Sequence, residues 1–433
     1  MDELYNDTEE NWASTYRGIN KTGYNSFIKV AILIAPKGRD YHTSGLILLV
    51  YSTIVQWILL YSGFITLFKA SHDLILFIEI SHYYSILLAI HILFMEHFIF
   101  KMKKSRQIFQ VMDIDIYDYG TDFDRSQIEN SRLKTAYYMP YVRKGIYACL
   151  GLTGIILAVL PLVQLARGVE KTRDGILVIL PVPFWFPFNT ETSLGFALAY
   201  FFELNMIAFA VFYLGTYFPF IIHMMVEIIS HFRILNHSFL TIDERTSAMY
   251  GTVDKDSVPG TSSSSQELMH LVENSLYERC YSECLRRNIL HHKAILDFVE
   301  LFQDVHSTLF GVLLGANMLV IAAITIVITK VEFSLETSKF YVMMVIELIN
   351  VFIYCFLGTF ITEEAKRVGI TIYSTPWLSS SKRNRKLVQF VQLRVSHDVV
   401  LKGNGIFSLN LQLYIQIMQT SYSIFNLFNS VDT

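Results

Sequence analysis

The sequence is short of charged residues. Asp, Glu, Lys and Arg make up 17% of its 433 residues, whereas soluble domains are usually nearer about 25% charged. The hydrophobic share is 52%, and the mean hydropathy is +0.39. The apolar residues gather into long blocks, and a helix needs about 20 of them to cross a hydrocarbon core of about 30 Å. The shortage of charge therefore excludes an ordinary soluble domain and predicts an all-α, polytopic membrane protein.

Cysteine is also scarce, with four in the chain. Cys149 and Cys355 fall inside predicted membrane helices, while Cys280 and Cys284 share one face of a predicted cytosolic helix, where thiols stay reduced. No cysteine is left for the predicted outer loops, so we expect no extracellular disulfide. The Cys280–Cys284 pair has no further ligand residues near it, which favours packing over a metal site. We expect neither a metal nor a cofactor.

Motifs that bind phosphate or activate a nucleophile are missing as well. The sequence has no Gly-rich phosphate loop, no nucleophile elbow and no HExxH. His291 and His292 are adjacent, so they point to different faces of a helix, and packing is the favoured interpretation. We therefore expect no enzyme, no catalytic residue and no nucleic-acid partner.

Seven apolar blocks are long enough to span a bilayer as helices. The N-terminal segment and every second loop carry 29 Lys and Arg residues, whereas the remaining loops carry 6. Positively charged loops stay on the cytosolic side, which predicts a cytosolic N-terminus and, after seven crossings, an extracellular C-terminus. The blocks are residues 44–68, 74–100, 145–166, 195–226, 306–329, 340–361 and 406–430.

The polar stretches between the blocks indicate how the chain is organised. Helical spacing from Leu285 to Phe302 predicts a helix that starts in the cytosol and continues into the fifth crossing. The sixth helix is expected to continue past Glu363 to Tyr373, so that several helices form a cytosolic anchor bundle. The expected segments are the cytosolic N-terminal segment (1–43), transmembrane helices 1–4 (44–229), a cytosolic loop with anchor helices (230–305), helices 5–6 (306–361), a cytosolic anchor segment (362–405) and helix 7 with the C-terminus (406–433).

Three polar or amphipathic stretches complete this picture. Residues 27–36 are predicted to lie in the cytosolic membrane interface, and residues 112–125 to form a solvated connection. The Ser-rich stretch 255–267 has nothing to bury and is predicted to be disordered.

Six stretches carry a resemblance to a known family. Taken in order over nearly the whole chain, they resemble the insect odorant receptors. The stretches are LPVPFWFPFNTETSLGFALAYFFE (180–203), HFRILNHSF (231–239), LRRNILHHKAILDFVELFQDVHSTLFGVLL (285–314), GTFITEEAKRVGITIYSTPW (358–377), KLVQFVQL (386–393) and FSLNLQLYIQIMQTSYSIFNLF (407–428).

The resemblance implies an odorant-gated, non-selective cation channel in the plasma membrane of olfactory neuron dendrites. Family members form a heterotetramer with an odorant co-receptor around one pore. Their cytosolic helix extensions make an anchor that holds most subunit contacts. The outer part of the seventh helix lines the pore, and a volatile odorant binds among helices two to six in the outer half of the bilayer.

Two departures place the chain within that family. The co-receptor carries a much longer insertion in its second cytosolic loop, so the resemblance favours an odorant-tuned subunit. The related gustatory receptors usually end with Thr-Tyr followed by Gln-Phe, whereas this chain has Ser421-Tyr422 and Phe428-Asn429. That difference favours the odorant branch over a gustatory-receptor-type channel.

The last apolar block carries a stripe of polar side chains without any charge. At helical spacing, Gln412, Gln416, Gln419, Ser423, Asn426 and Ser430 fall on one face. Such a stripe either joins helices through hydrogen bonds or faces water in a pore that solvates cations weakly. Matching Tyr422 to the family's tyrosine places Phe425 and Phe428 or Asn429 near the hydrophobic gate. We expect Phe425 to be the constriction and Gln419 and Asn429 its wet neighbours.

Three carboxylates and a set of aromatic residues are further candidates. Glu79, Glu203 and Glu347 lie roughly 7–12 Å below the outer helix ends, so they either line a vestibule that attracts cations or bond to polar neighbours in the bundle. A small apolar odorant would fit an aromatic cage at this depth, although aromatics in membrane helices mostly pack. The candidate ligand residues are His82, Tyr83, Tyr84, Leu157, Pro161, Tyr200, Phe209, Tyr341 and Met344.

Two other classes of seven-helix or polytopic protein compete with this interpretation. A G-protein-coupled receptor needs its N-terminus outside and usually has an acidic-Arg motif after helix three, where this chain has PLVQLARG. A transporter predicts repeated halves with broken helices, and no repeat is visible. Both are disfavoured.

Overall fold

The computed structural model describes residues 43–96, 100–114, 119, 125–166, 172–173, 176–177, 179–257, 266–330, 332 and 337–431. Helices dominate these residues, as predicted. The N-terminal helices are α3 (Thr43–Lys69), the 3-10 turn η2 (Ala70–His72), α4 (Leu74–Met95), α5 (Met102–Ile114) and α6 (Arg125–Ala166). The later helices are α7 (Ser193–Leu240), α8 (Ile242–Ser257), α9 (Gln266–Lys330), α10 (Ser338–Tyr373), the 3-10 turn η5 (Trp377–Ser379), α11 (Lys382–Val395) and α12 (Leu411–Val431).

Two short antiparallel hairpins are the strands among the described residues. Strand β1 (Thr172–Arg173) pairs with β2 (Ile176–Leu177) between α6 and α7. Strand β3 (Lys402–Gly403) pairs with β4 (Phe407–Ser408) between α11 and α12. Each hairpin therefore lies in a connection and leaves the helical framework uninterrupted.

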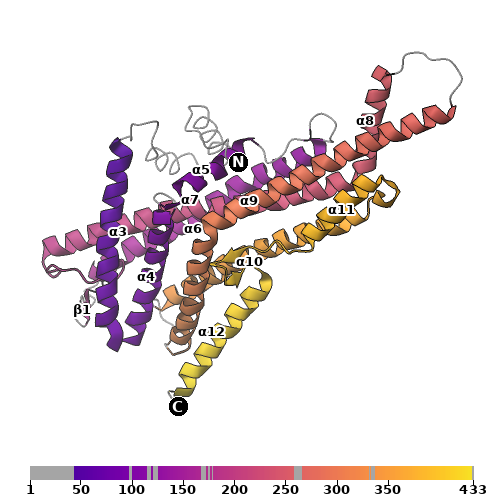
Figure 1. Cartoon of the computed structure of the whole chain (residues 1–433). Helices are drawn as coiled ribbons and strands as arrows, with labels where there is room; N and C mark the ends of the chain where they lie inside the picture. Colours follow the sequence, from indigo (N-terminus) through magenta and orange to yellow (C-terminus); the bar gives the residue numbers. More distant parts are fainter. Residues whose placement is uncertain are drawn as a thin grey trace.

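Six of the described helices are long and apolar enough to cross a membrane. They are α3, α4, α6, α7, α9 and α10, which correspond to the first six predicted blocks, although α4 ends at Met95 and the second block was expected to reach residue 100. The seventh block forms α12, a helix of 21 residues that does not count among these six because its amides lower its hydropathy. Figure 1 shows α3 and α4 side by side and α12 beside the end of α9, with the C-terminus at its tip.

Four helices are much longer than a bilayer is thick. Helix α9 has 65 residues and α7 has 48, so they measure about 98 Å and 72 Å at 1.5 Å per residue. Helix α9 is continuous from Gln266 to Lys330, and α10 ends at Tyr373, as the spacing predicts. In Figure 1 these extensions gather with α8 and α11 at one end of the molecule.

Two expected connections are shorter than predicted among the described residues. Residues 112–125 were expected to form a solvated connection, but α5 extends to Ile114 and α6 begins at Arg125, 20 residues before the apolar block. Hydropathy marks where a helix enters lipid and not where it begins, so polar helical turns escape it. In the stretch 255–267, α8 extends to Ser257 and α9 starts at Gln266. The intervening residues 258–265 and the predicted interfacial stretch 27–36 lie outside the described residues.

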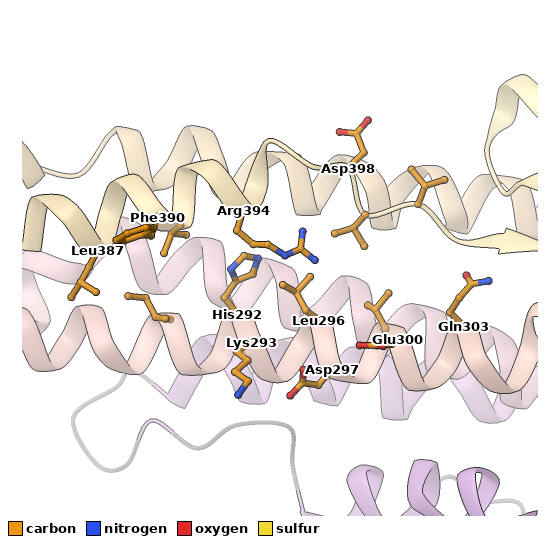
Figure 2. A pocket seen from close by; sticks show the side chains of 15 residues that line it. His292, Lys293, Leu296, Asp297, Glu300, Gln303, Leu387, Phe390, Arg394 and Asp398 are labelled. Carbon is orange, nitrogen blue, oxygen red and sulfur yellow. The ribbon is translucent and has the colours of Figure 1, made fainter. Parts of the chain in front are cut away.

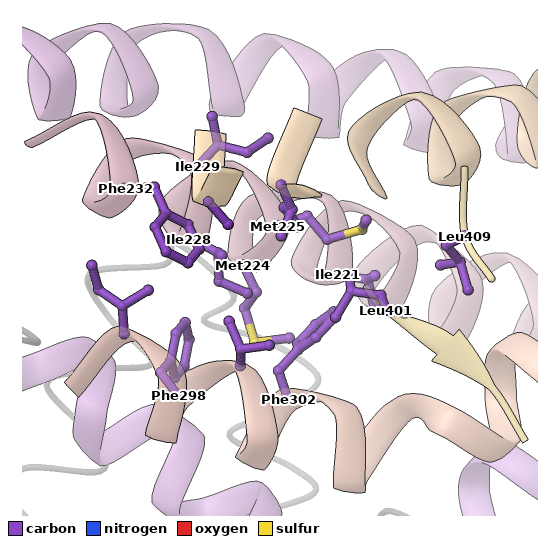
Figure 3. Packing of buried hydrophobic residues seen from close by; sticks show 14 of the residues in the cluster. Ile221, Met224, Met225, Ile228, Ile229, Phe232, Phe298, Phe302, Leu401 and Leu409 are labelled. Atoms are coloured by element: carbon purple, nitrogen blue, oxygen red, sulfur yellow. The ribbon is translucent and has the colours of Figure 1, made fainter. Parts of the chain in front are cut away.

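The main core lies where α7, α9 and α10 pack together. Figure 3 shows Met224 and Phe232 of α7 facing Phe298 and Phe302 of α9, all fully buried. Leu401 and Leu409, from the connection between α11 and α12, join the same cluster. The core therefore ties the long helices to the segment that leads into α12.

Candidate functional site

Helix α12 packs on α9 and α10 along one narrow face. Leu413, Ile417 and Ser421 recur every four residues, and all three are buried. The hydroxyl of Ser421 donates to the carbonyl of Met318 in α9 at 3.3 Å. The packed face therefore uses two aliphatic side chains and one small polar residue, which lets the helices come close.

The polar stripe of α12 lies opposite this packed face. Its six residues, Gln412, Gln416, Gln419, Ser423, Asn426 and Ser430, are all exposed. The Ser423 hydroxyl donates to the carbonyl of Gln419 in its own helix at 2.9 Å. The stripe therefore does not join α12 to α9 or α10, and it presents its amides to whatever lies beside the chain.

Phe425, the predicted constriction, lies between these two faces. Phe425 is half-buried and its ring lies 6.2 Å from the ring of Tyr422, which is 63% exposed. Phe428 and Asn429 belong to α12, but their side chains lie outside the described part of the chain. The assignment of Phe425, Phe428, Asn429 and Gln419 to a gate stays a prediction.

Four predicted ligand residues meet in one cluster of α4, α6 and α7. Tyr83 is buried there, and Tyr84, Leu157 and Tyr200 pack against the same core. The hydroxyl of Tyr200 donates to the carbonyl of Ala158, which joins α7 to α6. The structure thus brings together aromatic rings from α4 and α7 and the aliphatic Leu157 of α6, the kind of lining that a small apolar ligand requires.

The other predicted ligand residues lie apart from this cluster or at its edge. Phe209 stacks on Tyr213 with centroids 5.7 Å apart and packs against the main core. Met344 packs between the main core and a small cluster of α4, α9 and α10, while Tyr341 is 38% exposed. Pro161 is buried in α6, and the ring of His82 meets that of Tyr83 at 5.6 Å.

The three carboxylates have different surroundings. Glu203 is fully buried, and its Oε2 accepts a hydrogen bond from the backbone N–H of Val182 at 2.9 Å. Glu347 is 6% exposed, and its Oε1 lies 3.9 Å from Nδ1 of the buried His82. Glu79 is half-buried on α4. In these contacts Glu203 and Glu347 meet polar groups of the bundle, the N–H of Val182 and the ring of His82.

Sequence reasoning missed a buried loop, residues 179–186, that closes over this bundle. Phe184 and Val182 are fully buried. The N–H of Trp185 donates to Oγ1 of Thr66 at 2.8 Å, and the hydroxyl of Ser62 donates to the carbonyl of Trp185. The signal was available, because LPVPFWFP is too apolar for a solvated outer loop.

A polar network fixes the anchor end. Arg245 of α8 is 7% exposed and donates to the carbonyl of Ser238 and to Oδ1 of Asn288, both at 2.7 Å. Its guanidinium lies 5.3 Å from the ring centre of Tyr119, whose hydroxyl meets Nδ1 of His291 at 2.7 Å. His291 and the neighbouring His292 are both buried, in keeping with packing roles.

An open cleft of about 690 Å³ separates α9 from α11 at the anchor end. Figure 2 shows His292 of α9 and Arg394 of α11 pointing toward one another across it. Phe390, 68% exposed, lines the same cleft together with the carboxylates Asp297 and Glu300. The cleft thus combines apolar surface with charges of both signs.

The comparisons with known proteins agree on one family. The family model described as 7tm Odorant receptor matches residues 78–422, which is more than half of the chain. Odorant receptor 10a of Drosophila melanogaster is 27% identical over 147 residues, 34% of this chain and 36% of that protein. Odorant receptor 82a of the same species is 20% identical over 286 residues, 65% of each. The match with odorant receptor 10a therefore spans about a third of that protein's length.

Solved structures show the same fold. The insect olfactory receptor OR5 from Machilis hrabei superimposes with a TM-score of 0.69 at 17% sequence identity, covering 95% of this chain and 100% of that one. The structure of that receptor in complex with eugenol gives a TM-score of 0.68 with the same coverage. Together with the family match, these likenesses confirm the resemblance of the six sequence stretches. The chain belongs to the seven-transmembrane odorant receptor family, a family of receptors rather than of enzymes.

Proposed function

We propose that this chain is an odorant-tuned subunit of a ligand-gated, non-selective cation channel in the plasma membrane. The exposed amide stripe of α12 carries the proposal. Six polar, uncharged side chains point away from the helix's packed face, and exposed amides facing lipid would cost free energy because hydrocarbon offers them no hydrogen bonds. A water-filled pore formed with other subunits satisfies them.

The topology supports this arrangement. Helix α12 has 21 residues, about 31 Å at 1.5 Å per residue, so it is long enough to make a seventh crossing after the six apolar helices. The excess of Lys and Arg on alternate connections favours a cytosolic N-terminus. Seven crossings then leave the C-terminal end of α12, with Phe425 and Asn429, on the outer side.

The ligand in this proposal is a small volatile molecule bound among α4, α6, α7 and α10. Tyr83, Tyr84, Leu157 and Tyr200 supply rings and aliphatic surface within one cluster. Met344 of α10, which packs against the main core and the small cluster of α4, α9 and α10, supplies an adaptable thioether. Such a site suits an apolar ester, aldehyde or terpenoid with one hydrogen-bonding group.

The vestibule hypothesis is tested by replacing the three carboxylates. If Glu79, Glu203 and Glu347 attract cations to the pore, changing all three to Gln reduces conductance and divalent block. If they only bond within the bundle, as the Glu203 contact with Val182 favours, conductance and block stay unchanged. Single-channel recording of the triple variant distinguishes the two.

Assembly is proposed to occur through the anchor end. Ile370, Tyr373, Leu378, Phe390 and Leu393 belong to α10, η5 and α11, and all are more than 60% exposed. Large apolar side chains outside the lipid mark an interaction surface. We propose that co-receptor subunits cover them in a heterotetramer.

Co-expression with an odorant co-receptor tests the proposal. Excised patches without GTP should carry a fast cation current when a panel of volatile esters, aldehydes and terpenoids is applied. A response that requires GTP would indicate a G-protein-coupled receptor instead. Silence across the panel, with both subunits confirmed at the cell surface, would refute the channel proposal.

A further inference from the structure

The connection between α11 and α12, residues 396–410, is held by side chains of two other helices. This linker leaves α11, forms the β3–β4 hairpin and enters α12 directly. Gln303 and Ser307 of α9 bond to it on one side, and Thr359 and Thr362 of α10 on the other. The bonds reach backbone atoms of the linker or, for Thr359, of the first residue of α12, so they fix the path of the linker.

On the α9 side, the side chain of Gln303 bonds to both the N–H and the carbonyl of Lys402. Its Oε1 accepts the Lys402 N–H at 2.8 Å, and its side-chain amide donates to the Lys402 carbonyl. One turn later, the Ser307 hydroxyl donates to the same carbonyl at 3.1 Å. The N–H of Asn404 lies 3.0 Å from both the hydroxyl and the carbonyl oxygen of Ser307. This pattern fixes the hairpin against α9 as a neighbouring strand would.

Glycines let the hairpin and α9 touch through their backbones. A Cβ atom on Gly403 would lie 2.7 Å from the backbone nitrogen of Gly311, and one on Gly311 would lie 2.5 Å from Nδ2 of Asn404. Asn404 has a φ of 50° and Gly405 a φ of 71°, the left-handed region that Asn and Gly tolerate. The hairpin therefore has little space to shift along α9.

On the α10 side, Thr359 caps the first turn of α12. Its Oγ1 accepts the N–H of Leu411, the first residue of α12, at 2.9 Å. The first N–H groups of a helix have no partner inside it, and Asn410 supplies the other cap by accepting the N–H of Leu413 at 2.8 Å. A side chain of α10 therefore completes the start of the proposed pore helix.

The same α10 also carries proposed ligand residues. Met344 and Thr359 are 15 residues apart, about 22 Å along a helix. A displacement of the Met344 end therefore reaches the cap of α12 through one continuous helix, while Gln303 holds the linker to α9.

We propose that Thr359 and Gln303 are positioning residues of the gate, through which a ligand-driven shift of α10 moves α12. The inference rests on the proposed channel function. It adds to that function the contacts that couple the ligand bundle to the pore helix.

The test uses isosteric variants of the full chain co-expressed with the co-receptor. Thr359→Val keeps the side-chain shape and removes the acceptor, and Thr359→Ser restores the acceptor. Gln303→Leu removes both bonds to Lys402. Thr325→Val is the matched control, because the Thr325 hydroxyl donates to the carbonyl of Ile321 within its own helix at 2.7 Å.

The first readout is the ratio of the current at a saturating volatile mixture to the current without it. We expect Thr359→Val to lower this ratio about 2- to 13-fold, the factor that one hydrogen bond of roughly 0.5–1.5 kcal/mol supplies. Gln303→Leu removes two bonds to Lys402 and should lower it at least as much. Thr359→Ser and Thr325→Val should stay within about twofold of the parent chain. A purely structural defect would instead scale both currents with surface expression and leave the ratio unchanged, which would overturn the proposal.

The second readout is hydrogen exchange of residues 399–415 in the purified complex, which needs no current. Faster exchange in Thr359→Val than in Thr325→Val supports the role of Thr359 as a cap of α12, and equal exchange overturns that role. Faster exchange with an unchanged current ratio overturns the coupling role. If the parent chain carries no current, the channel proposal fails, while exchange still decides whether Thr359 holds α12.

Discussion

Glu203 is the carboxylate whose surroundings are most fully defined. It is fully buried in α7, and its Oε2 accepts the N–H of Val182 from the loop 179–186. A buried donor that loses its acceptor keeps the cost of desolvation without the bond. The carboxylate therefore holds the loop over the helix bundle, whatever its effect on cations.

Replacing Glu203 by Leu should lower the free energy of unfolding by about 1–3 kcal/mol, because the Val182 N–H is left without its acceptor. Glu203→Gln keeps an acceptor oxygen and should retain most of that stability. Thermal unfolding of the purified complex measures both. Equal melting temperatures for Glu203→Leu and the parent chain would show that the bond contributes nothing.

Arg245 stabilises the anchor end through hydrogen bonds to Ser238 and Asn288. Arg245→Met should lower the free energy of unfolding by about 1.5–3 kcal/mol, because the charged bonds to Ser238 and Asn288 are lost together. The exposed Arg279 provides the control, since Arg279→Met should change stability little. Chemical denaturation of the detergent-solubilised complex makes the comparison. A larger loss from Arg279→Met would contradict the assignment.

At the scale of elements, α12 shows what periodicity predicts and what it leaves open. Spacing placed Gln412, Gln416 and Gln419 on one face, but the same spacing fits a helix-joining stripe and a pore lining equally. The packed positions Leu413 and Ile417 turn the amides away from α9 and α10, so the stripe does not join α12 to these two helices. A neighbour distant in sequence settles which way a helix faces.

Placing a positive charge on the exposed face of α12 should obstruct cation flow. Gln419→Lys is expected to reduce the cation current roughly tenfold, because like charges 4 Å apart repel by about 1 kcal/mol in water and about 4 kcal/mol at an effective dielectric of 20. Gln419→Ala adds no charge and should keep most of the current. Recordings at matched surface expression distinguish them, and an undiminished current in Gln419→Lys would place the stripe outside the pore.

At the scale of the whole molecule, the anchor end exposes large apolar side chains among the described residues. Helix α11 exposes Phe390 and Leu393 beside the cleft of about 690 Å³, well away from the apolar stretches of α3 and α4. The acidic Asp297 and Glu300 and the basic Arg394 border it. Such a surface offers both apolar contact and charge complementarity to another subunit.

A charge at the centre of this surface should disrupt assembly. Phe390→Asp is expected to weaken association with the co-receptor by about 2 kcal/mol or more, as for a central aromatic side chain in an interface. Gln389→Ser, one residue away and also exposed, is the control. Co-purification and native mass measurement report the tetramer fraction. An intact tetramer with Phe390→Asp would show that the interface lies elsewhere.

The sequence by itself determined the class of protein, because apolar blocks of bilayer length and their flanking charges depend on composition alone. It also determined that α9 and α10 extend beyond the membrane, since helical spacing continues through polar residues. The tertiary structure decided the rest. Only folding brings Val182 to Glu203, Gln303 to Lys402 and Thr359 to Leu411, because those contacts join segments 21, 99 and 52 residues apart. Periodicity describes one helix at a time and carries no information about which neighbour a face will meet.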